Sequence, residues 1–154
     1  MENLIVLLVD DEPRYLETTS RLLARKGCAV ATAESGMEAL ALLSREPVHV
    51  VVLDVKMPGM DGHETFRAIR RSHPLVEVIL LTGHGTVDSA VEGLKAGAFD
   101  YLVKPAEIDL LWEKVSEAWQ ANRRHAEKIR LAMLERSMQS PREIMKQQGP
   151  KADA

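Results

Sequence analysis

The sequence has little of what marks an exported or membrane-bound protein. Its single cysteine, Cys28, excludes an internal disulfide, and such sparing use of cysteine is typical of reducing compartments. The longest apolar run has six residues, far short of the roughly 20 that cross a bilayer. The acidic Glu2 precedes a short apolar run, and Asp10, Asp11 and Glu12 follow it, which is not the pattern of a signal peptide. We therefore expect a cytoplasmic protein that makes no membrane contact.

Charge is distributed unevenly along the 154 residues. Residues 121–154 hold eight Lys or Arg and four Asp or Glu, whereas residues 1–120 hold twelve and nineteen. This contrast predicts an acidic domain, 1–120, and a basic helical extension, 121–154, that is frayed at its end. The length suits one domain with a sizeable core and a modest appendage.

Five apolar segments alternate with helical patterns in the first 120 residues. The expected strands are 4–9, 28–33, 48–54, 77–82 and 98–103, and the expected helices are 13–26, 35–46, 62–71, 86–96 and one from 107 onward. Strictly alternating elements predict a parallel sheet with helices on both faces. The expected fold is α/β, a doubly wound five-stranded parallel sheet in the order 2-1-3-4-5 with an extended C-terminal helix.

The last predicted helix runs beyond the end of this domain. Residues at the 4-3 spacing of a coiled coil are Ile108, Trp112, Val115, Trp119, Asn122, Ala126, Ile129 and Met133. The early members are expected to cover the sheet, whereas those after residue 120 have no domain left to pack on. Asn122 either fixes the register of a dimeric coiled coil or lies exposed on a frayed helix. The pattern from Ser140 to Glu143 predicts a further short helix, to about residue 148.

Polar side chains follow four of the five predicted strands. Asp10 and Asp11 follow the first, Asp54 ends the third, Thr82 ends the fourth and Lys104 follows the fifth. The carboxyl ends of parallel strands meet at one edge of the sheet, where open α/β sheets bind ligands. Carboxylates at close range call for a cation, and their oxygens suit Mg²⁺, while a lysine and a hydroxyl suit a phosphoryl group. The edge therefore predicts phosphoryl transfer with Asp54 as the nucleophile.

A simpler interpretation exists for each of these residues taken alone. A single Asp, Thr or Lys at a strand end is usually a helix cap or a solvated group. Four such sites at one edge favour a functional site instead. The histidines at 49, 63, 73 and 125 lack the spacing of metal ligands and are interpreted as structural or surface residues.

Four motifs occur in the order that one signalling family shows: LLVDDEP, VVLDVKMPGMDG, LLTGHG and YLVKP. Over about residues 3–120 the chain resembles the CheY-like receiver domains of two-component response regulators. The stretch TGHGTVDSAVEGLKAGAFDYLVKP is most similar to receivers of the NtrC type. The resemblance implies a phosphoprotein that receives its phosphoryl group from a sensor histidine kinase. It also implies a signalling domain, not an enzyme, that catalyses only its own phosphorylation and dephosphorylation.

The resemblance assigns the acidic residues to metal binding and phosphorylation. Asp10 and Asp11 match the acid pair that holds Mg²⁺, with Asp11 as the direct ligand, and Asp54 matches the phosphoacceptor. The backbone carbonyl of Lys56 matches the third protein ligand of the metal. Asp54 is thus expected both to bind Mg²⁺ and to carry the phosphate.

The resemblance also assigns a phosphate-binding lysine and a switch. Lys104 matches the lysine, and the bond to Pro105 is implied to be cis. Thr82 matches the switch hydroxyl and Tyr101 the switch aromatic, although Tyr101 could also be an ordinary core residue. Phosphorylation is then expected to reshape the face made by the fourth helix, the fifth strand and the fifth helix.

The output of this switch is not visible in the sequence. No helix-turn-helix, ATPase loop of the form GxxxxGK[ST] or catalytic signature follows residue 120. The chain is either a stand-alone receiver, forming a homodimer through the switch face or its long helix, or the receiver and linker of an NtrC-type transcriptional activator. Glu127, Glu135 and Glu143 interrupt the basic extension, so it favours a solvated helix face over DNA contact.

One enzyme class is a competing interpretation. Phosphohydrolases of the haloacid dehalogenase type also place a nucleophilic Asp at a strand end. They need a second acid two residues later, where this chain has Lys56. The sequence therefore favours the receiver.

Overall fold

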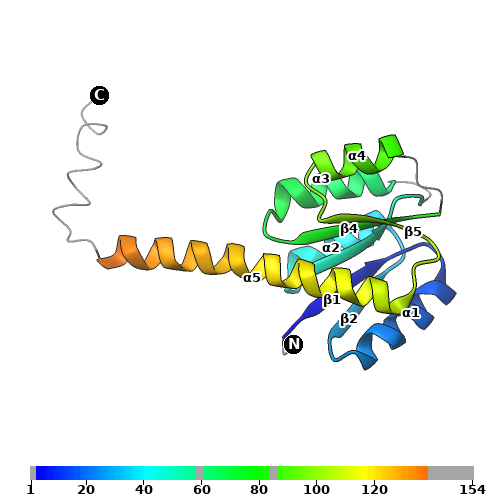
Figure 1. Ribbon diagram of the computed structural model, residues 1–154, viewed down its shortest axis with the longest axis horizontal. Coiled ribbons are helices and arrows are strands. Elements are labelled where there is room, and N and C mark those ends of the chain that lie inside the picture. The colour runs from blue at the N-terminus through cyan, green and yellow to red at the C-terminus, as the bar shows by residue number, and fades with distance from the viewer. Residues whose placement is uncertain (1–2, 58–60, 84–86, 139–154) are drawn as a thin grey trace. The chain divides into compact units, whose positions relative to one another are not determined.

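The computed structural model describes residues 3–57, 61–83 and 87–138 (Figure 1). Its elements, in order, are β1 (Ile5–Val9), α1 (Pro13–Arg25), β2 (Ala29–Ala33), α2 (Gly36–Arg45), β3 (Val50–Asp54), α3 (Gly62–Ser72), β4 (Glu77–Thr82), α4 (Val87–Lys95), β5 (Asp100–Val103) and α5 (Ile108–Met138). The predicted alternation is confirmed, with most bounds shifted by one or two residues. The short helix predicted near residues 140–148 lies outside the described part.

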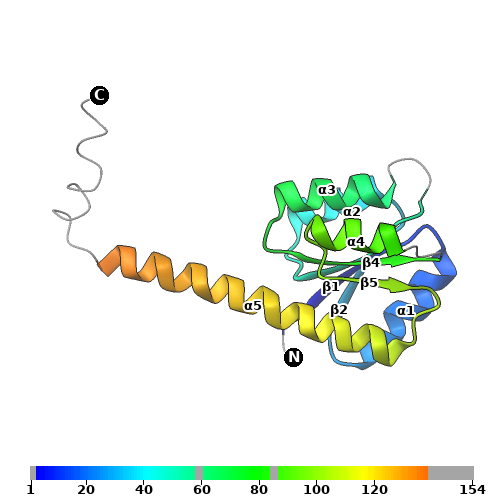
Figure 2. The same ribbon diagram turned by 45° about the horizontal axis from the view of Figure 1, so that its top comes forward.

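The five strands form one parallel sheet in the order β2-β1-β3-β4-β5, as predicted (Figures 1 and 2). The register aligns the carboxyl ends of the strands. Val9 pairs with Leu53, so Asp10 and Asp54 are the next residues on neighbouring strands. Thr82 pairs with Val103, the residue before Lys104. The predicted polar residues therefore share one edge of the sheet.

Helices cover both faces of the sheet because alternate residues of the central strands point to opposite sides. Val51 and Leu53 belong to the core beneath α2 and α3, whereas Val50 and Val52 belong to the core beneath α1 and the first part of α5. Every residue of β3 is buried. Burial on both faces explains the uninterrupted apolar run from Val50 to Leu53.

A close backbone approach fixes the end of β3 against the start of α3. The amide of Gly62 donates a hydrogen bond to the carbonyl of Val55 at 3.2 Å. A Cβ atom on Gly62 would lie 2.3 Å from the Val55 Cα and 2.4 Å from the Asp54 carbonyl oxygen. Asp61 caps α3 by accepting a hydrogen bond from the Glu64 amide at 2.8 Å. The backbone around Asp54 is thus held by the helix that follows it.

The chain divides into two units, Met1–Asn122 and Arg123–Ala154, so the domain boundary expected at residue 120 stays a prediction. In the first unit the early part of α5 buries Leu111, Val115 and Ala118. In the second, the described part of α5 exposes five large apolar side chains, Ile129, Leu131, Met133, Leu134 and Met138. Within the described residues, no helix is both long and apolar enough to cross a membrane.

Asn122 corrects an expectation. Its side chain is only 8% exposed, and its Nδ2 donates a hydrogen bond to the carbonyl of Leu75 at 2.7 Å. The interpretation of an exposed asparagine is therefore wrong. Nor is its amide directed to a second helix, because it binds the segment before β4 of its own domain.

Candidate functional site

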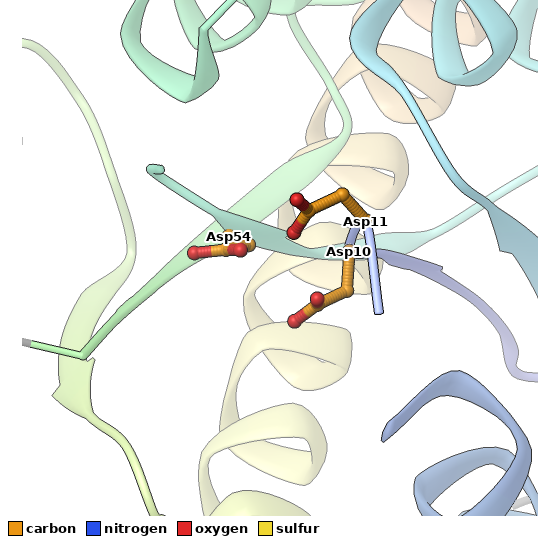
Figure 3. A group of neighbouring side chains, drawn as sticks. All are labelled: Asp10, Asp11 and Asp54. Atoms are coloured by element: carbon orange, nitrogen blue, oxygen red, sulfur yellow. The ribbon is translucent and has the colours of Figure 1, made fainter. Parts of the chain in front are cut away.

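Three carboxylates meet at the carboxyl edge of the sheet. Asp10 follows β1 and is fully buried, Asp54 ends β3 and is 5% exposed, and Asp11 is exposed. One oxygen of each lies within 4.8 Å of the others, so this group could hold a metal ion. Figure 3 shows the carboxylates of Asp10 and Asp11 directed towards Asp54. A donor set made only of oxygen atoms fits a hard divalent cation such as Mg²⁺.

Backbone amides fix the orientation of the two buried carboxylates. Asp10 Oδ1 accepts a hydrogen bond from the Glu12 amide at 2.9 Å, and Asp54 Oδ1 accepts one from the Lys56 amide at 3.1 Å. Both amides lie two residues after the carboxylate that they bind, as in an Asx turn. Each side chain is therefore held by the loop that its own strand leads into.

Lys104 completes the cluster. Its Nζ donates a hydrogen bond to Asp10 Oδ2 and lies 3.7 Å from Asp54 Oδ2, and its side chain is 17% exposed. The Lys104–Pro105 peptide bond is cis, as the resemblance implied. The structure thus brings together residues that lie 94 positions apart in the chain.

Burial and the neighbouring charges of the cluster shift the pKa values of Asp54 and Lys104. Burial raises the pKa of the Asp54 carboxyl; the charges of Asp10 and Asp11 raise it further, and the Lys56 amide and Lys104 ammonium oppose the rise. Burial alone would lower the pKa of Lys104, but its hydrogen bond to Asp10 and the two buried carboxylates outweigh that effect and raise it. The site therefore holds an ammonium beside a carboxyl that resists ionisation.

The two expected switch residues lie on neighbouring strands. Thr82 is buried at the end of β4, and its carbonyl accepts a hydrogen bond from the Lys104 amide at 2.6 Å. Tyr101 pairs with Leu80 on β4 and is partly buried against the core beneath α2 and α3. A Cβ atom on Gly93 of α4 would lie 3.5 Å from the Tyr101 ring, so this ring lies where α4 meets β5. The carbonyl of Lys56 as a metal ligand stays a prediction.

Sequence reasoning missed one residue at the site. The ring centroid of Tyr15, in the first turn of α1, lies 4.3 Å from Lys104 Nζ. A signal was available, because a helix that begins at Pro13 directly after Asp10 and Asp11 places its first turn at the same sheet edge. From the sequence alone, a tyrosine in a helix is interpreted as an ordinary core residue. Only the fold shows that the ring of Tyr15 faces Lys104.

Comparison with known proteins now decides the family. The profile of the response regulator receiver domain matches residues 6–116. The chain belongs to this family. The receiver is 41% identical over 113 residues to the transcriptional regulatory protein GlrR of Escherichia coli K12, covering 73% of this chain and 26% of GlrR. It is also 41% identical over 109 residues to the DNA-binding transcriptional regulator NtrC of Salmonella typhimurium, covering 71% of this chain and 23% of NtrC.

Solved structures give the same result. A CheY-like receiver domain from Methanospirillum hungatei superposes with a TM-score of 0.76 at 29% identity, covering 80% of this chain and 99% of that one. The predicted CheY-like fold and similarity to NtrC-type receivers are confirmed. The chain spans about a quarter of the length of the curated relatives it matches. It is a signalling domain of two-component systems, and the haloacid dehalogenase interpretation is set aside.

Proposed function

We propose that Asp54 accepts a phosphoryl group from the phosphohistidine of a sensor histidine kinase. The observation that carries this proposal is the Lys104 ammonium, 3.7 Å from Asp54 Oδ2 and hydrogen-bonded to Asp10. An Asp54 oxygen would form a bond to phosphorus while the phosphorus–nitrogen bond to the donor imidazole breaks. Lys104 lies where it can neutralise the phosphoryl oxygens during that exchange.

The carboxylates of Asp10, Asp11 and Asp54, with the carbonyl of Lys56, would hold Mg²⁺. When bound, the ion supplies positive charge that the crowded carboxylates and an incoming phosphoryl group both require. The Glu12 and Lys56 amides keep one oxygen of Asp10 and one of Asp54 in place, and the second oxygen of each faces Lys104. The chemistry in this proposal is limited to phosphorylation and dephosphorylation of the receiver itself.

Phosphorylation of Asp54 would act on the surface formed by α4, β5 and α5. The added negative charge attracts the Thr82 hydroxyl and the Lys104 ammonium. Movement of Thr82 would open space for the ring of Tyr101, which lies between β4, β5 and α4. The phosphoryl group need only shift an existing equilibrium by a few kcal/mol for this surface to present a different face to its partner.

The output proposal is a homodimer that pairs through α5 beyond Asn122. It is supported by Ile129, Leu131, Met133 and Leu134, which are exposed on one helix segment and in part follow a coiled-coil spacing. Pairing through the α4-β5-α5 surface is the alternative. Because curated relatives are transcriptional regulators, we propose that the chain is the cytoplasmic receiver and linker of an NtrC-type activator. DNA contact is not part of this proposal.

The acceptor assignment is tested by replacing Asp54. The wild-type chain, incubated with acetyl phosphate and Mg²⁺, should gain one hydroxylamine-labile phosphoryl group, measured by intact mass. The Asp54→Asn variant should gain none, because an amide oxygen cannot form a stable acyl phosphate. A matched Asp61→Asn variant, which changes a carboxylate on the helix cap outside the cluster, should label like the wild type.

The outcome that would contradict the assignment is hydroxylamine-labile phosphate on the Asp54→Asn chain. Label on both chains would mean that another carboxylate is the acceptor. Repeated release of phosphate from small phosphate esters would instead indicate a hydrolase.

A further inference from the structure

Tyr15 contacts the site although no role of the receiver requires it. Its ring centroid is 4.3 Å from Lys104 Nζ, within the range of a cation–π interaction. The other neighbours of this ammonium that the structure describes are the carboxylates of Asp10 and Asp54. The lysine head is therefore held between two acids and one aromatic ring.

The ring of Tyr15 is fixed in place by α1. Burial raises the pKa of its hydroxyl, and the nearby side chain of Thr19, a buried residue one helical turn later, opposes that rise. The ring also packs against the apolar core beneath α1 and α5. A ring packed along its body against the core presents a defined surface to the ammonium.

Lysine needs such a surface more than most residues do. Its ammonium is a point charge at the end of a flexible four-carbon stem, and it has three N–H donors. The contacts with Asp10 and Asp54 change when a metal ion and a phosphoryl group arrive, because both alter the charge on those acids. A ring face attracts the ammonium as a whole charge and does not commit a donor to one acceptor.

We propose that Tyr15 is a positioning residue for Lys104. The ring face of Tyr15 keeps the ammonium directed at Asp54 while the N–H groups of Lys104 exchange their hydrogen bonds to carboxylate oxygens for hydrogen bonds to phosphoryl oxygens. This inference rests on the proposed function of Asp54. It adds that the first turn of α1 contributes to phosphoryl transfer through Lys104, without touching the reacting atoms.

The test lowers the π-electron density of the ring at position 15 in steps, while the size of the ring stays nearly the same. Phenylalanine and its mono-, di- and trifluorinated analogues are placed at position 15, and the rate of labelling by acetyl phosphate with Mg²⁺ is measured. The Tyr15→Phe chain should label within about twofold of the wild type, since the ring face remains. The rate should then fall stepwise with each fluorine, and Tyr15→Leu should be about five- to thirtyfold slower.

A role in packing alone would not produce this grading. Equal rates across the fluorinated series would overturn the proposal, as would a Phe variant as slow as the Leu variant. In a Lys104→Ala background the Leu substitution should have no further effect. If Tyr15→Leu slows labelling in the Lys104→Ala chain as much as it does in the wild type, the proposal is also overturned.

A second readout separates this proposal from the function on which it rests. Ring current from Tyr15 should shift the ε-methylene protons of Lys104 upfield in NMR spectra of the unphosphorylated wild-type and Phe chains, but not of the Leu chain. Absence of that shift in the wild type overturns the contact. A shifted signal in a wild-type chain that takes no phosphate overturns the proposed function instead.

Discussion

At the scale of single residues, the site is a balance between burial and charge. Asp10 and Asp54 are almost fully buried, and Lys104 is close to both. A buried carboxylate is costly unless it is paired. One ammonium shared by two buried acids, with Asp11 nearby, leaves the cluster short of positive charge. The excess negative charge therefore favours binding of a cation. Without a cation, it lowers the free energy of unfolding of the receiver.

This shortage predicts how stability depends on Asp54 when no divalent ion is added. The Asp54→Asn chain should be more stable than the wild type near neutral pH, by roughly 1 kcal/mol in the free energy of unfolding. The physical reason is that burial and the neighbouring acids raise the pKa of Asp54 above its ordinary value of 3.8. Urea unfolding of both chains at several pH values, with a chelator present, measures the difference.

The sign of the pH dependence follows from that pKa. The native protein holds the Asp54 proton more tightly than the unfolded chain does, so the contribution of Asp54 to stability falls as pH rises through its native pKa. The advantage of the Asn chain should therefore shrink as pH is lowered towards 3.8. A less stable Asn chain at neutral pH would instead show that the attraction between Lys104 and Asp54 outweighs burial.

At the scale of elements, the junction between β3 and α3 sets the position of the acceptor. Gly62 lies so close to Val55 and to the Asp54 carbonyl that no side chain fits between them. β3 is buried throughout and α3 is buried at Gly62, so the backbone on both sides has little freedom to move. The position of Asp54 thus depends on a residue that takes no part in the chemistry.

Replacement of Gly62 by alanine should lower the free energy of unfolding by about 3 kcal/mol, the upper range for overpacking. The added Cβ would lie 2.3 Å from the Val55 Cα, so either α3 or the end of β3 must shift. Gly83→Ala is the matched control, because a Cβ there has no atom within 4 Å. Urea denaturation of both variants measures the effect, and equal stabilities would contradict the close approach.

Element bounds were predicted to within about two residues because apolar runs, prolines and glycines mark them. Pro13 starts α1, and Gly27 follows it with a positive φ of 107°. β5 is shorter than predicted: Ala98 and Phe99 continue the apolar pattern but lie outside Asp100–Val103. Pattern alone does not show where ladder hydrogen bonding begins.

At the scale of the whole molecule, α5 leaves the domain at Asn122 and continues to Met138. The side-chain amide of Asn122 donates a hydrogen bond to the carbonyl of Leu75, and the residues after Asn122 belong to the second unit. Apolar side chains on that unit have no partner among the residues described for it. A second copy of the same segment would cover them.

This proposal predicts that the receiver forms a dimer in solution and that Ile129→Glu with Met133→Glu makes it a monomer. Charges at both seam positions oppose burial of the helix face. Sedimentation equilibrium measures the mass, and the urea midpoint of the domain should not change. Lys128→Gln, on the outward side of the same turn, is the control and should stay dimeric. A double variant that remains a dimer would favour pairing through the α4-β5-α5 surface.

The sequence by itself determined the fold, the family and the edge at which the functional residues meet. Buried parallel strands must be apolar throughout, so a carboxylate or lysine that directly follows such a run stands out in the sequence. Only the tertiary structure decided which charges are paired. Lys104 bonds to Asp10, faces the ring of Tyr15, and lies near Asp54, while Asn122 binds the Leu75 carbonyl. These contacts join residues far apart in the chain, and their geometry depends on helix packing that no local pattern specifies.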